Sequence, residues 1–427
     1  MPKSNDAVVD IHIMGIGVAE QAQLSEVAQT ALLQADAVIG SDRQLETMSL
    51  LLKQQGVQPE LQLLPKLAHL PAMITQYLGK SVVVLASGDP LYYGIGRWFS
   101  QNLSHHNLHF YPAVSSIQQA CHHLGLSQQD VTVLSLHGRP FEQLRSHLKN
   151  HQTTLVLTDK HSQPHRLAEE CLAAGFELST LTVCENLGYQ HQKIRQFSAQ
   201  QLVTDIDLQV DPLHVTVIQT QGQGGLLPEF PGFPDDRFIT GDVPGKGMIS
   251  KRETRLSILS LMQLVNDDIV WDVGAGCGGV SVELAYWNKD VTVYAIEHHN
   301  ERLGHLNANR DRFGVVSNLH IVEGRAPECL SDLPLPNKIF IGGSDGELKR
   351  LLNLAWDILP VNGLLVASAV MDLTRQQLNE FAETLEDPQV ESVDIGVTRG
   401  QLTQGKMTYT QKLPVSIFKF TKTGGVI

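Results

Sequence analysis

A glycine-rich turn in the second half of the chain constrains the fold more than any other feature of the sequence. In the segment IVWDVGAGCGGVSVELA, the residues Gly274, Gly276 and Gly279 form a G-x-G-x-x-G pattern between an apolar strand-like run and a helical run. The glycines permit a tight turn and a close backbone approach to a ligand, and the start of the helix adds the positive end of its dipole. We therefore predict a Rossmann-like, doubly wound α/β domain with its ligand at the carboxyl ends of the strands.

Two carboxylates on either side of this turn indicate which ligand it takes. Glu297 ends the next strand-like run, about 20 residues further on, where it can accept hydrogen bonds from both hydroxyls of a ribose. Asp272 stands just before the glycines, where it would repel a pyrophosphate but could bind the ammonium of a methionine moiety, directly or through water. The pattern therefore favours S-adenosylmethionine, and NAD stays as the alternative.

Length and composition limit the other function classes. At roughly 150 residues per domain, a chain of 427 residues holds two or three domains. Its net charge of −13 disfavours nucleic acid as a partner, because an acidic surface repels phosphates. The five cysteines lie far apart without a C-x-x-C pair, so we expect reduced thiols and no metal site. With no basic-then-apolar leader and no apolar stretch near 18 residues, we expect a cytoplasmic protein without a membrane partner.

A segment rich in glycine and proline divides the chain. It occupies residues 223–237, which predicts an N-terminal domain of residues 1–222 and a C-terminal domain of residues 238–427. In the first domain, apolar strand-like runs alternate with helical stretches, which indicates an α/β fold there as well. The sequence thus predicts two α/β domains joined by a linker.

The C-terminal domain resembles the decarboxylating precorrin methyltransferases of cobalamin biosynthesis. The resemblance rests on PGKGMISKRETR (244–255), DVGAGCGGVSVELA, YAIE, NLHIVEGRAPECL (318–330) and IFIGGSDGEL (339–348), in the family's order and spacing. It implies that S-adenosylmethionine lies against the glycine loop, the acidic residue that ends the second strand, a small residue after the Gly-Arg pair, and a hydroxyl before the first helix. With Asp272, the implied cofactor residues are Ser250, Gly274, Ala275, Gly276, Cys277, Gly278, Glu297 and Ala326. Ser250 stands where the family usually has threonine.

The N-terminal domain resembles the tetrapyrrole methylases, and specifically the member that methylates carbon 5. The motifs are DIHIMGIG (10–17), ALLQADAVIGSDRQLE (31–46), VVVLASGDPLYYGIG (82–96), YPAVSSIQQA (111–120) and VCENLG (183–188). Such domains bind S-adenosylmethionine in a cleft between two α/β lobes, without a Rossmann fingerprint. The resemblance implies cofactor contacts at Gly88, Asp89, Ser115 and Ser116.

Together the two resemblances imply one cofactor per domain and a single tetrapyrrole substrate. The expected activity is methylation of precorrin-6Y at carbons 5 and 15 with decarboxylation of the ring C acetate, which gives precorrin-8. A cobalt-containing substrate, an NAD-dependent oxidoreductase, an RNA or protein methylase disfavoured by the charge, and a tetrapyrrole-binding protein without catalysis are the alternatives. We also expect a homo-oligomer.

Basic residues lead into the first helix of the C-terminal domain. Because the implied substrate carries many carboxylates, Arg255 and Lys251 are predicted to contact them. Arg399 and Lys406, in the loop-like TRGQLTQGK, are weaker candidates of the same kind. The structural alternative is that Arg255 pairs with a carboxylate inside the domain and holds the helix down.

Overall fold

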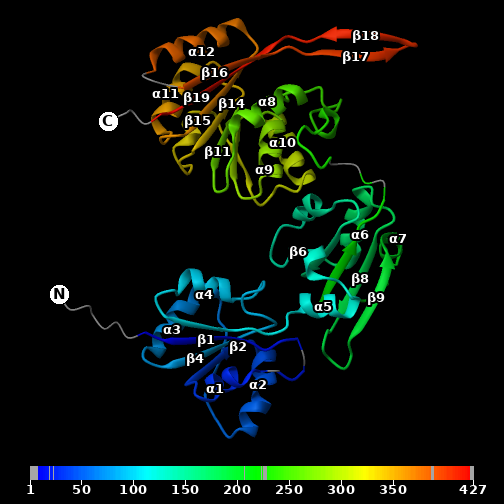
Figure 1. The fold of residues 1–427 in the computed structure, drawn as a ribbon, viewed down its shortest axis with the longest axis vertical. Helices are drawn as coiled ribbons and strands as arrows, with labels where there is room; N and C mark the ends of the chain where they lie inside the picture. The colour runs from blue at the N-terminus through cyan, green and yellow to red at the C-terminus, as the bar shows by residue number, and fades with distance from the viewer. Residues whose placement is uncertain are drawn as a thin grey trace, which may run out of the picture. The chain divides into compact units, whose positions relative to one another are not determined.

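A computed structural model describes residues 8–18, 20–22, 24–205, 207–222, 224, 228–385 and 389–423. The chain forms two compact units, each of which is described by itself (Figure 1). Unit 1 is Met1–Arg139 with Asn150–Gly222, and unit 2 is Pro140–Lys149 with Gln223–Ile427. The segment Pro140–Lys149, which the sequence assigned to the first domain, thus groups with unit 2. Part of the predicted linker lies outside the described residues.

The first half of unit 1 is a parallel sheet covered by helices on both faces. Its strand order is β3(Glu60–Leu63), β2(Ala37–Gly40), β4(Ser81–Ala86), β1(Asp10–Gly15), β5(Asn107–Tyr111). One face packs against α3(Leu70–Ile74) and α4(Gly96–Asn102), and the other against α1(Glu26–Leu33) and α2(Asp42–Gln54). Burial on both faces explains why β4 reads as the continuous apolar run SVVVLA.

The second half of unit 1 is a mixed sheet. Its order is β6(Val131–Ser135), β7(Thr153–Leu157), β10(His214–Gln219), β8(Thr180–Glu185), β9(Lys193–Ser198), with only the β6–β7 pair parallel among these described strands. The helices of this half are α5(Ser116–Leu124), α6(Pro164–Ala173) and α7(Ala199–Thr204). Helix α5 packs Ile117, Ala120 and Cys121 against β7, β8 and β10. Unit 1 therefore consists of two α/β lobes.

Unit 2 has a seven-stranded sheet. Its order is β13(Leu319–Glu323), β12(Thr292–Glu297), β11(Ile269–Val273), β14(Lys338–Ile341), β15(Leu364–Ala369), β19(Val415–Thr421), β16(Gln389–Ile395), and the first five strands are parallel. One core packs against α8(Arg252–Met262), α9(Gly279–Trp287) and α10(Asn300–Arg312), and the other against α11(Leu348–Ile358) and α12(Asp372–Thr384). Along β11, Val270 belongs to the first core and Trp271 to the second. The predicted doubly wound α/β fold is confirmed.

A two-stranded ribbon leaves this sheet between β16 and β19. It comprises β17(Thr398–Thr403) and β18(Lys406–Gln411), and every residue of both strands is exposed. The sequence predicted a loop here, because the polar and glycine-containing residues of this segment show no buried face.

No helix in the described part of the chain is long and apolar enough to cross a membrane.

Candidate functional site

A cavity of about 510 Å³ opens at the carboxyl ends of the parallel strands of unit 2. Strands β11 and β14 are neighbours in the sheet, although β12 and β13 come between them in the sequence and lie on the other side of β11. The strand order therefore reverses at this point. Such a reversal leaves a crevice between the loops. The loops after β11, β12, β13 and β14 line the cavity. The segment 244–251 before α8, here called the strap, contributes residues 247–251 to the lining.

The glycine turn is held between the strap and the loop after β14. Gly274 has a φ of +73°, and a Cβ there would lie 2.5 Å from the carbonyl oxygen of Gly343. Gly276 has a φ of +59°, and its Cβ would lie 2.5 Å from the carbonyl oxygen of Met248. Both the backbone conformation and the lack of space therefore require glycine. Gly274, Ala275 and Gly276, which the sequence predicts to contact a ligand, all line the cavity.

Two other residues of the glycine loop do not line the cavity. Cys277 is 1% exposed, its backbone N–H donates to the carbonyl of Met248 at 3.0 Å, and its Sγ lies 3.8 Å from Nδ1 of His305. Gly278 is the N-cap of α9, and a Cβ there would meet Leu306 at 2.4 Å. The turn directs both residues toward α10, so the structure does not support the predicted contacts of Cys277 and Gly278 with the cofactor.

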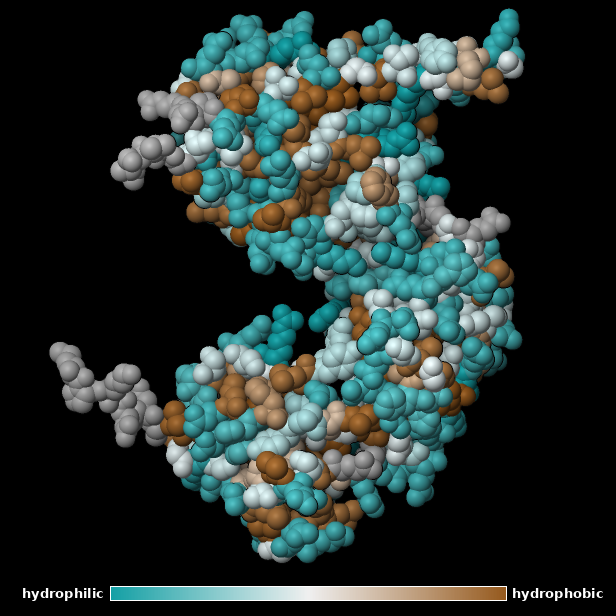
Figure 2. All heavy atoms as spheres, in the orientation of Figure 1, coloured by the Kyte–Doolittle hydropathy of each residue, from teal (hydrophilic) through white to brown (hydrophobic). Residues whose placement is uncertain are grey.

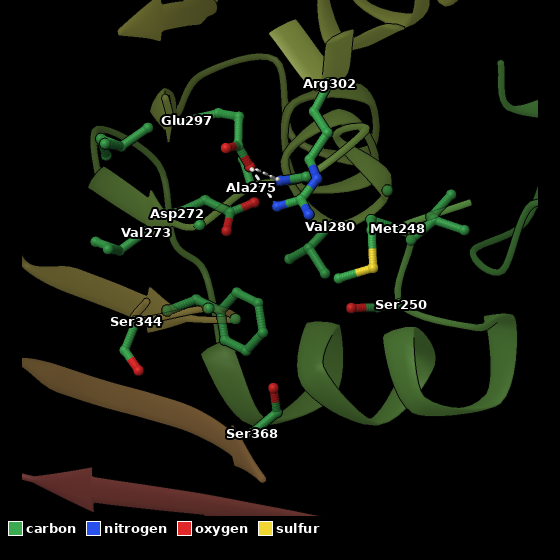
Figure 3. Close-up of a pocket in the computed structure, with 18 of the residues that line it drawn as sticks. Met248, Ser250, Asp272, Val273, Ala275, Val280, Glu297, Arg302, Ser344 and Ser368 are labelled. Carbon is green, nitrogen blue, oxygen red and sulfur yellow. Dashed lines mark hydrogen bonds and ion pairs between the residues drawn. The ribbon is translucent and has the colours of Figure 1, made fainter. Parts of the chain in front are cut away.

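Glu297 is the best-oriented acceptor of the cavity. Its carboxylate is buried, Oε1 accepts from the backbone N–H groups of His298 and His299 at 2.9 Å each, and Oε2 accepts from Gly276 at 2.9 Å. Arg302 of α10 lies 3.9 Å from Oε2 (Figure 3). A carboxylate has about four lone-pair sites. Oε2 therefore keeps capacity for a ligand hydroxyl.

Asp272 has a buried carboxylate oxygen that no protein group satisfies. Its Oδ2 accepts from the hydroxyl of Ser281, while its Oδ1 has no hydrogen-bond partner among the residues that the structure describes. Burial, with a smaller contribution from the charge of Glu297, raises the pKa of Asp272 to about 7. In Figure 3 Asp272 and Glu297 lie on the same side of the cavity. A buried acceptor without a partner is costly. The site therefore fits a ligand that brings a cationic donor to Asp272 and a hydroxyl to Glu297.

The strap carries Ser250 and Lys251 to the opposite side of the cavity. Both residues line it, and so does Ala326 in the loop after β13. The ammonium of Lys251 donates to the carbonyl of Gly245. Six further lining residues were not predicted from the sequence. Three of them, His298, Arg325 and Ser344, come within three residues after a strand, which is a usable signal. The other three are Met248, Arg302 and Ser368.

Arg255 does not face the cavity, so the prediction that it contacts a substrate carboxylate is wrong. Its side chain is 0% exposed and donates from Nε to Glu283 Oε1 at 2.5 Å. One terminal nitrogen donates to Asp235 Oδ1 at 3.1 Å and to the carbonyl of Ser250 at 2.6 Å, and the other to the carbonyl of Phe233. The structure shows the alternative, in which Arg255 pairs with a carboxylate inside the domain. Arg255 ties the strap to α9 and to residues 233–235, which precede the strap.

In unit 1 the predicted residues come together at the carboxyl ends of three adjacent parallel strands. The loops after β1, β4 and β5 meet there: Gly88 donates its N–H to the carbonyl of Gly17 at 3.1 Å, and a Cβ on Gly88 would lie 3.0 Å from the Cα of Ser115. Gly88 has a φ of +65°. Its part in cofactor binding, which the resemblance implies, stays a prediction.

The polar side chains of this cluster are engaged within the protein. Asp89 Oδ1 accepts from the N–H groups of Leu91 at 2.8 Å and Tyr92 at 3.0 Å, and Oδ2 accepts from Ala113 at 3.4 Å. Ser115 is the N-cap of α5, where its hydroxyl accepts from Gln118 at 3.2 Å, and Ser116 is the first residue of that helix. Cofactor contacts of Asp89, Ser115 and Ser116 stay predictions.

The fold and the site of unit 2 define a Rossmann-like methyltransferase, joined to a two-lobed α/β unit. The family model of the precorrin methyltransferase domain matches residues 244–422, and that of the tetrapyrrole (corrin/porphyrin) methylases matches residues 10–203.

One curated relative spans both units. The precorrin-6Y C(5,15)-methyltransferase [decarboxylating] of a Sinorhizobium species is 34% identical over 371 residues, which are 86% of each chain. This chain therefore belongs to the family of the decarboxylating precorrin-6Y C5,15-methyltransferases, and it is a decarboxylating methyltransferase. Family membership excludes the NAD-dependent oxidoreductase.

Two shorter proteins are also similar. The "probable cobalt-precorrin-6B C(15)-methyltransferase (decarboxylating)" of Methanothermobacter thermautotrophicus is 33% identical over 174 residues, 40% of this chain and 85% of that protein. A crystal structure of precorrin-6Y C5,15-methyltransferase from Geobacter metallireducens is 32% identical, with a TM-score of 0.42, over 45% of this chain and 98% of that chain.

Proposed function

We propose that this enzyme methylates precorrin-6Y at carbons 5 and 15 and decarboxylates the ring C acetate, giving precorrin-8 in cobalamin biosynthesis. Unit 1 methylates carbon 5, and unit 2 methylates carbon 15 and releases carbon dioxide. The observation that carries this proposal for unit 2 is the pair of carboxylates on one cavity, with Asp272 Oδ1 lacking a partner and Glu297 oriented by backbone N–H groups.

S-adenosylmethionine fits this pair of carboxylates. Asp272 receives the ammonium of the methionine part, and Glu297 accepts hydrogen bonds from the ribose hydroxyls. Ala326 in the loop after β13 and Ser250 in the strap flank the cofactor. The cofactor supplies a methyl group that its sulfonium already activates. The protein's main task is therefore to hold cofactor and macrocycle in line, which can contribute an effective molarity of the order of 10⁵ M or more.

The mouth of the cavity suits a flat macrocycle with peripheral carboxylates. Met248 and Val370 line the cavity and are 61% and 54% exposed, so they offer an apolar surface to a ring face. Arg302 and Arg325 also line it but are paired with Glu297 and Asp345. Among the described residues, the ammonium of Lys251 binds only the carbonyl of Gly245, and we assign it to a substrate carboxylate. After carbon dioxide leaves, its bonding electrons pass into the conjugated ring, which is then protonated.

Unit 1 is proposed to bind a second S-adenosylmethionine at the loops that contain Gly88, Asp89 and Ser115. Support comes from the meeting of three loops at one sheet edge and from the tetrapyrrole methylase match over residues 10–203. Calorimetry with S-adenosylhomocysteine should find two sites per chain. A single site on the intact, folded chain would refute one cofactor per unit.

The overall reaction is tested by mass spectrometry of a precorrin-6Y pool after incubation with enzyme and methyl donor. The expected products have gained two methyl groups and lost one carbon dioxide. A parallel incubation with the cobalt-containing macrocycle separates the two substrate alternatives, because only the true substrate should turn over. The proposed homo-oligomer is tested by sedimentation of the full chain.

A further inference from the structure

The exposed ribbon β17–β18 is fixed to the rest of unit 2 at its base. All strand residues of the ribbon are exposed, and Figure 2 shows hydrophobic and hydrophilic side chains mixed along it. A two-stranded ribbon without a core is marginal by itself. Near its base, Arg399 binds Glu253 Oε2 at 2.7 Å and Asp235 Oδ2 at 3.2 Å. Glu253 lies in the first turn of α8, so these bonds hold the base of the ribbon beside the start of that helix.

The start of α8 is also a wall of the cofactor cavity. Lys251, the N-cap of α8, lines the cavity, and so does Val415, where β19 begins after the ribbon. Lys412 lies between the ribbon and Val415, and its backbone N–H donates to the carbonyl of Val397 at 2.8 Å. Lys412 therefore stands at the base of the ribbon, three residues before Val415, which lines the cavity.

Positive charge collects at this point although the whole chain carries −13. Burial lowers the pKa of Lys251, and the charges of Arg399, Arg255 and Lys412 lower it further, against Asp235, which raises it. Arg399 and Arg255 already bind carboxylates of the protein. Lys412 is exposed, and no carboxylate in the described part of the chain lies within ion-pair distance of it. Two ammonium groups therefore remain for an external anion, and their mutual repulsion favours one that bridges them.

We propose that Lys412, at the base of the ribbon, binds a peripheral carboxylate of the macrocycle together with Lys251. The ribbon thereby becomes part of the substrate site of unit 2, and Arg399 acts as the positioning residue that holds it there. The inference rests on the proposed function, because the anion is a carboxylate of the tetrapyrrole that unit 2 decarboxylates. Its chemistry is simple recognition of a carboxylate by two ammonium groups.

The test uses the full chain with Lys412→Gln and the matched control Lys406→Gln. The sequence made Lys406 a weaker candidate for a substrate carboxylate, but the structure puts it at the tip of the ribbon, opposite Thr403 and at the other end of β18 from Gln411 and the base. Lys406→Gln therefore removes the same charge away from the cavity. Steady-state release of labelled carbon dioxide from the ring C acetate of precorrin-6Y gives KM and kcat. Calorimetry with S-adenosylhomocysteine measures the cofactor site independently.

The expected result for Lys412→Gln is a KM for the macrocycle raised about three- to tenfold, in the range of single exposed charge contacts. Its kcat and its affinity for S-adenosylhomocysteine should stay unchanged, and KM should depend less steeply on salt. Lys406→Gln should match the wild type. Lys412→Arg should restore most of the lost affinity. In the double variant with Lys251→Gln, KM should rise less than the two single effects combined, because both ammonium groups bind one anion.

Three results would overturn the inference. A KM for Lys412→Gln equal to that for Lys406→Gln would remove Lys412 from the substrate site. A parallel loss of affinity for S-adenosylhomocysteine would show that Lys412 only supports the strap. If the wild-type chain released no carbon dioxide from precorrin-6Y, the proposed function would fail and this inference with it, whereas the first two results leave the proposed function intact.

Discussion

The two units place their motif carboxylates in opposite ways. In unit 2, Asp272 keeps an oxygen without a partner beside a cavity, and Glu297 keeps acceptor capacity there. In unit 1, both oxygens of Asp89 accept backbone N–H groups of the turn that contains it and of the loop after β5. A motif residue can therefore serve the ligand or build the loop that will hold the ligand. Substitutions should separate these two roles, because the first changes affinity and the second changes stability.

The largest effect is expected from Arg255→Met, which tests whether the strap is held by a buried ion pair. The change leaves Glu283 buried without its cationic partner, although three N–H groups still donate to it, and breaking a buried ion pair costs about 3–5 kcal/mol. Differential scanning calorimetry should show the transition of unit 2 at a much lower temperature and that of unit 1 unchanged. The control is Arg252→Met on the same helix, whose side chain is 47% exposed and should melt like the wild type. A stable Arg255→Met protein that lost only substrate affinity would restore the original prediction.

Glu297→Ala should abolish one of the two cofactor sites. Hydrogen bonds to charged acceptors contribute roughly 1.5–3 kcal/mol each, so affinity for S-adenosylhomocysteine in unit 2 should fall at least about tenfold. Calorimetry of the full chain should then detect the site of unit 1 alone at micromolar ligand. Glu301→Ala, in the first turn of α10, removes the same charge outside the lining of the cavity and should retain both sites. Two unchanged sites in Glu297→Ala would separate Glu297 from the cofactor.

The pH dependence of cofactor binding tests Asp272. Its pKa in the free protein is raised to about 7, so at pH 6 about a tenth of the chains hold it ionised, and a cationic ligand should bind about tenfold more weakly there than at pH 8. Asp272→Asn should flatten this profile, while Glu297, the charged neighbour, is kept. Equal pH profiles in wild type and variant would contradict the assignment.

The raised pKa of Asp272 also makes the free energy of unfolding depend on pH. Because the folded-state pKa of Asp272 lies above the ordinary value of 3.8, the folded chain binds a proton that the unfolded chain has released between about pH 4 and pH 7. The contribution of this group to the free energy of unfolding therefore falls as pH rises through that window. Asp272→Asn should remove this part of the pH dependence from the melting of unit 2.

The smallest effect is expected from Asp89→Ala, the counterpart in unit 1. Three backbone N–H groups lose their acceptor in a partly exposed loop, and losses of this kind cost about 1 kcal/mol. The transition of unit 1 should move down by a few degrees while that of unit 2 stays. The control is Asp42→Ala, which removes an acidic residue from the first turn of α2 in the same unit. A large loss of affinity without loss of stability would place Asp89 in the cofactor site instead.

The sequence alone determined the fold class and the centre of the site in unit 2. A glycine turn between a strand and a helix has few backbone solutions, so the positions of Gly274 and Gly276, and of the carboxylates that flank them, follow from local geometry. Helical periodicity also indicates that Arg255 is buried. Arg255 shares a helical face with Ile258 and Met262, and a cation on a buried face indicates an internal partner.

Tertiary structure alone decided what lies opposite the glycine turn. Met248 meets Gly276 because the strap crosses the turn, and the base of the ribbon lies beside the start of α8 because Arg399 binds Glu253. Residues 253 and 399 are far apart in the chain, and no local propensity or spacing encodes their contact. It follows from strand order and from which side chains bury together, which are properties of the packed sheet and not of any short segment.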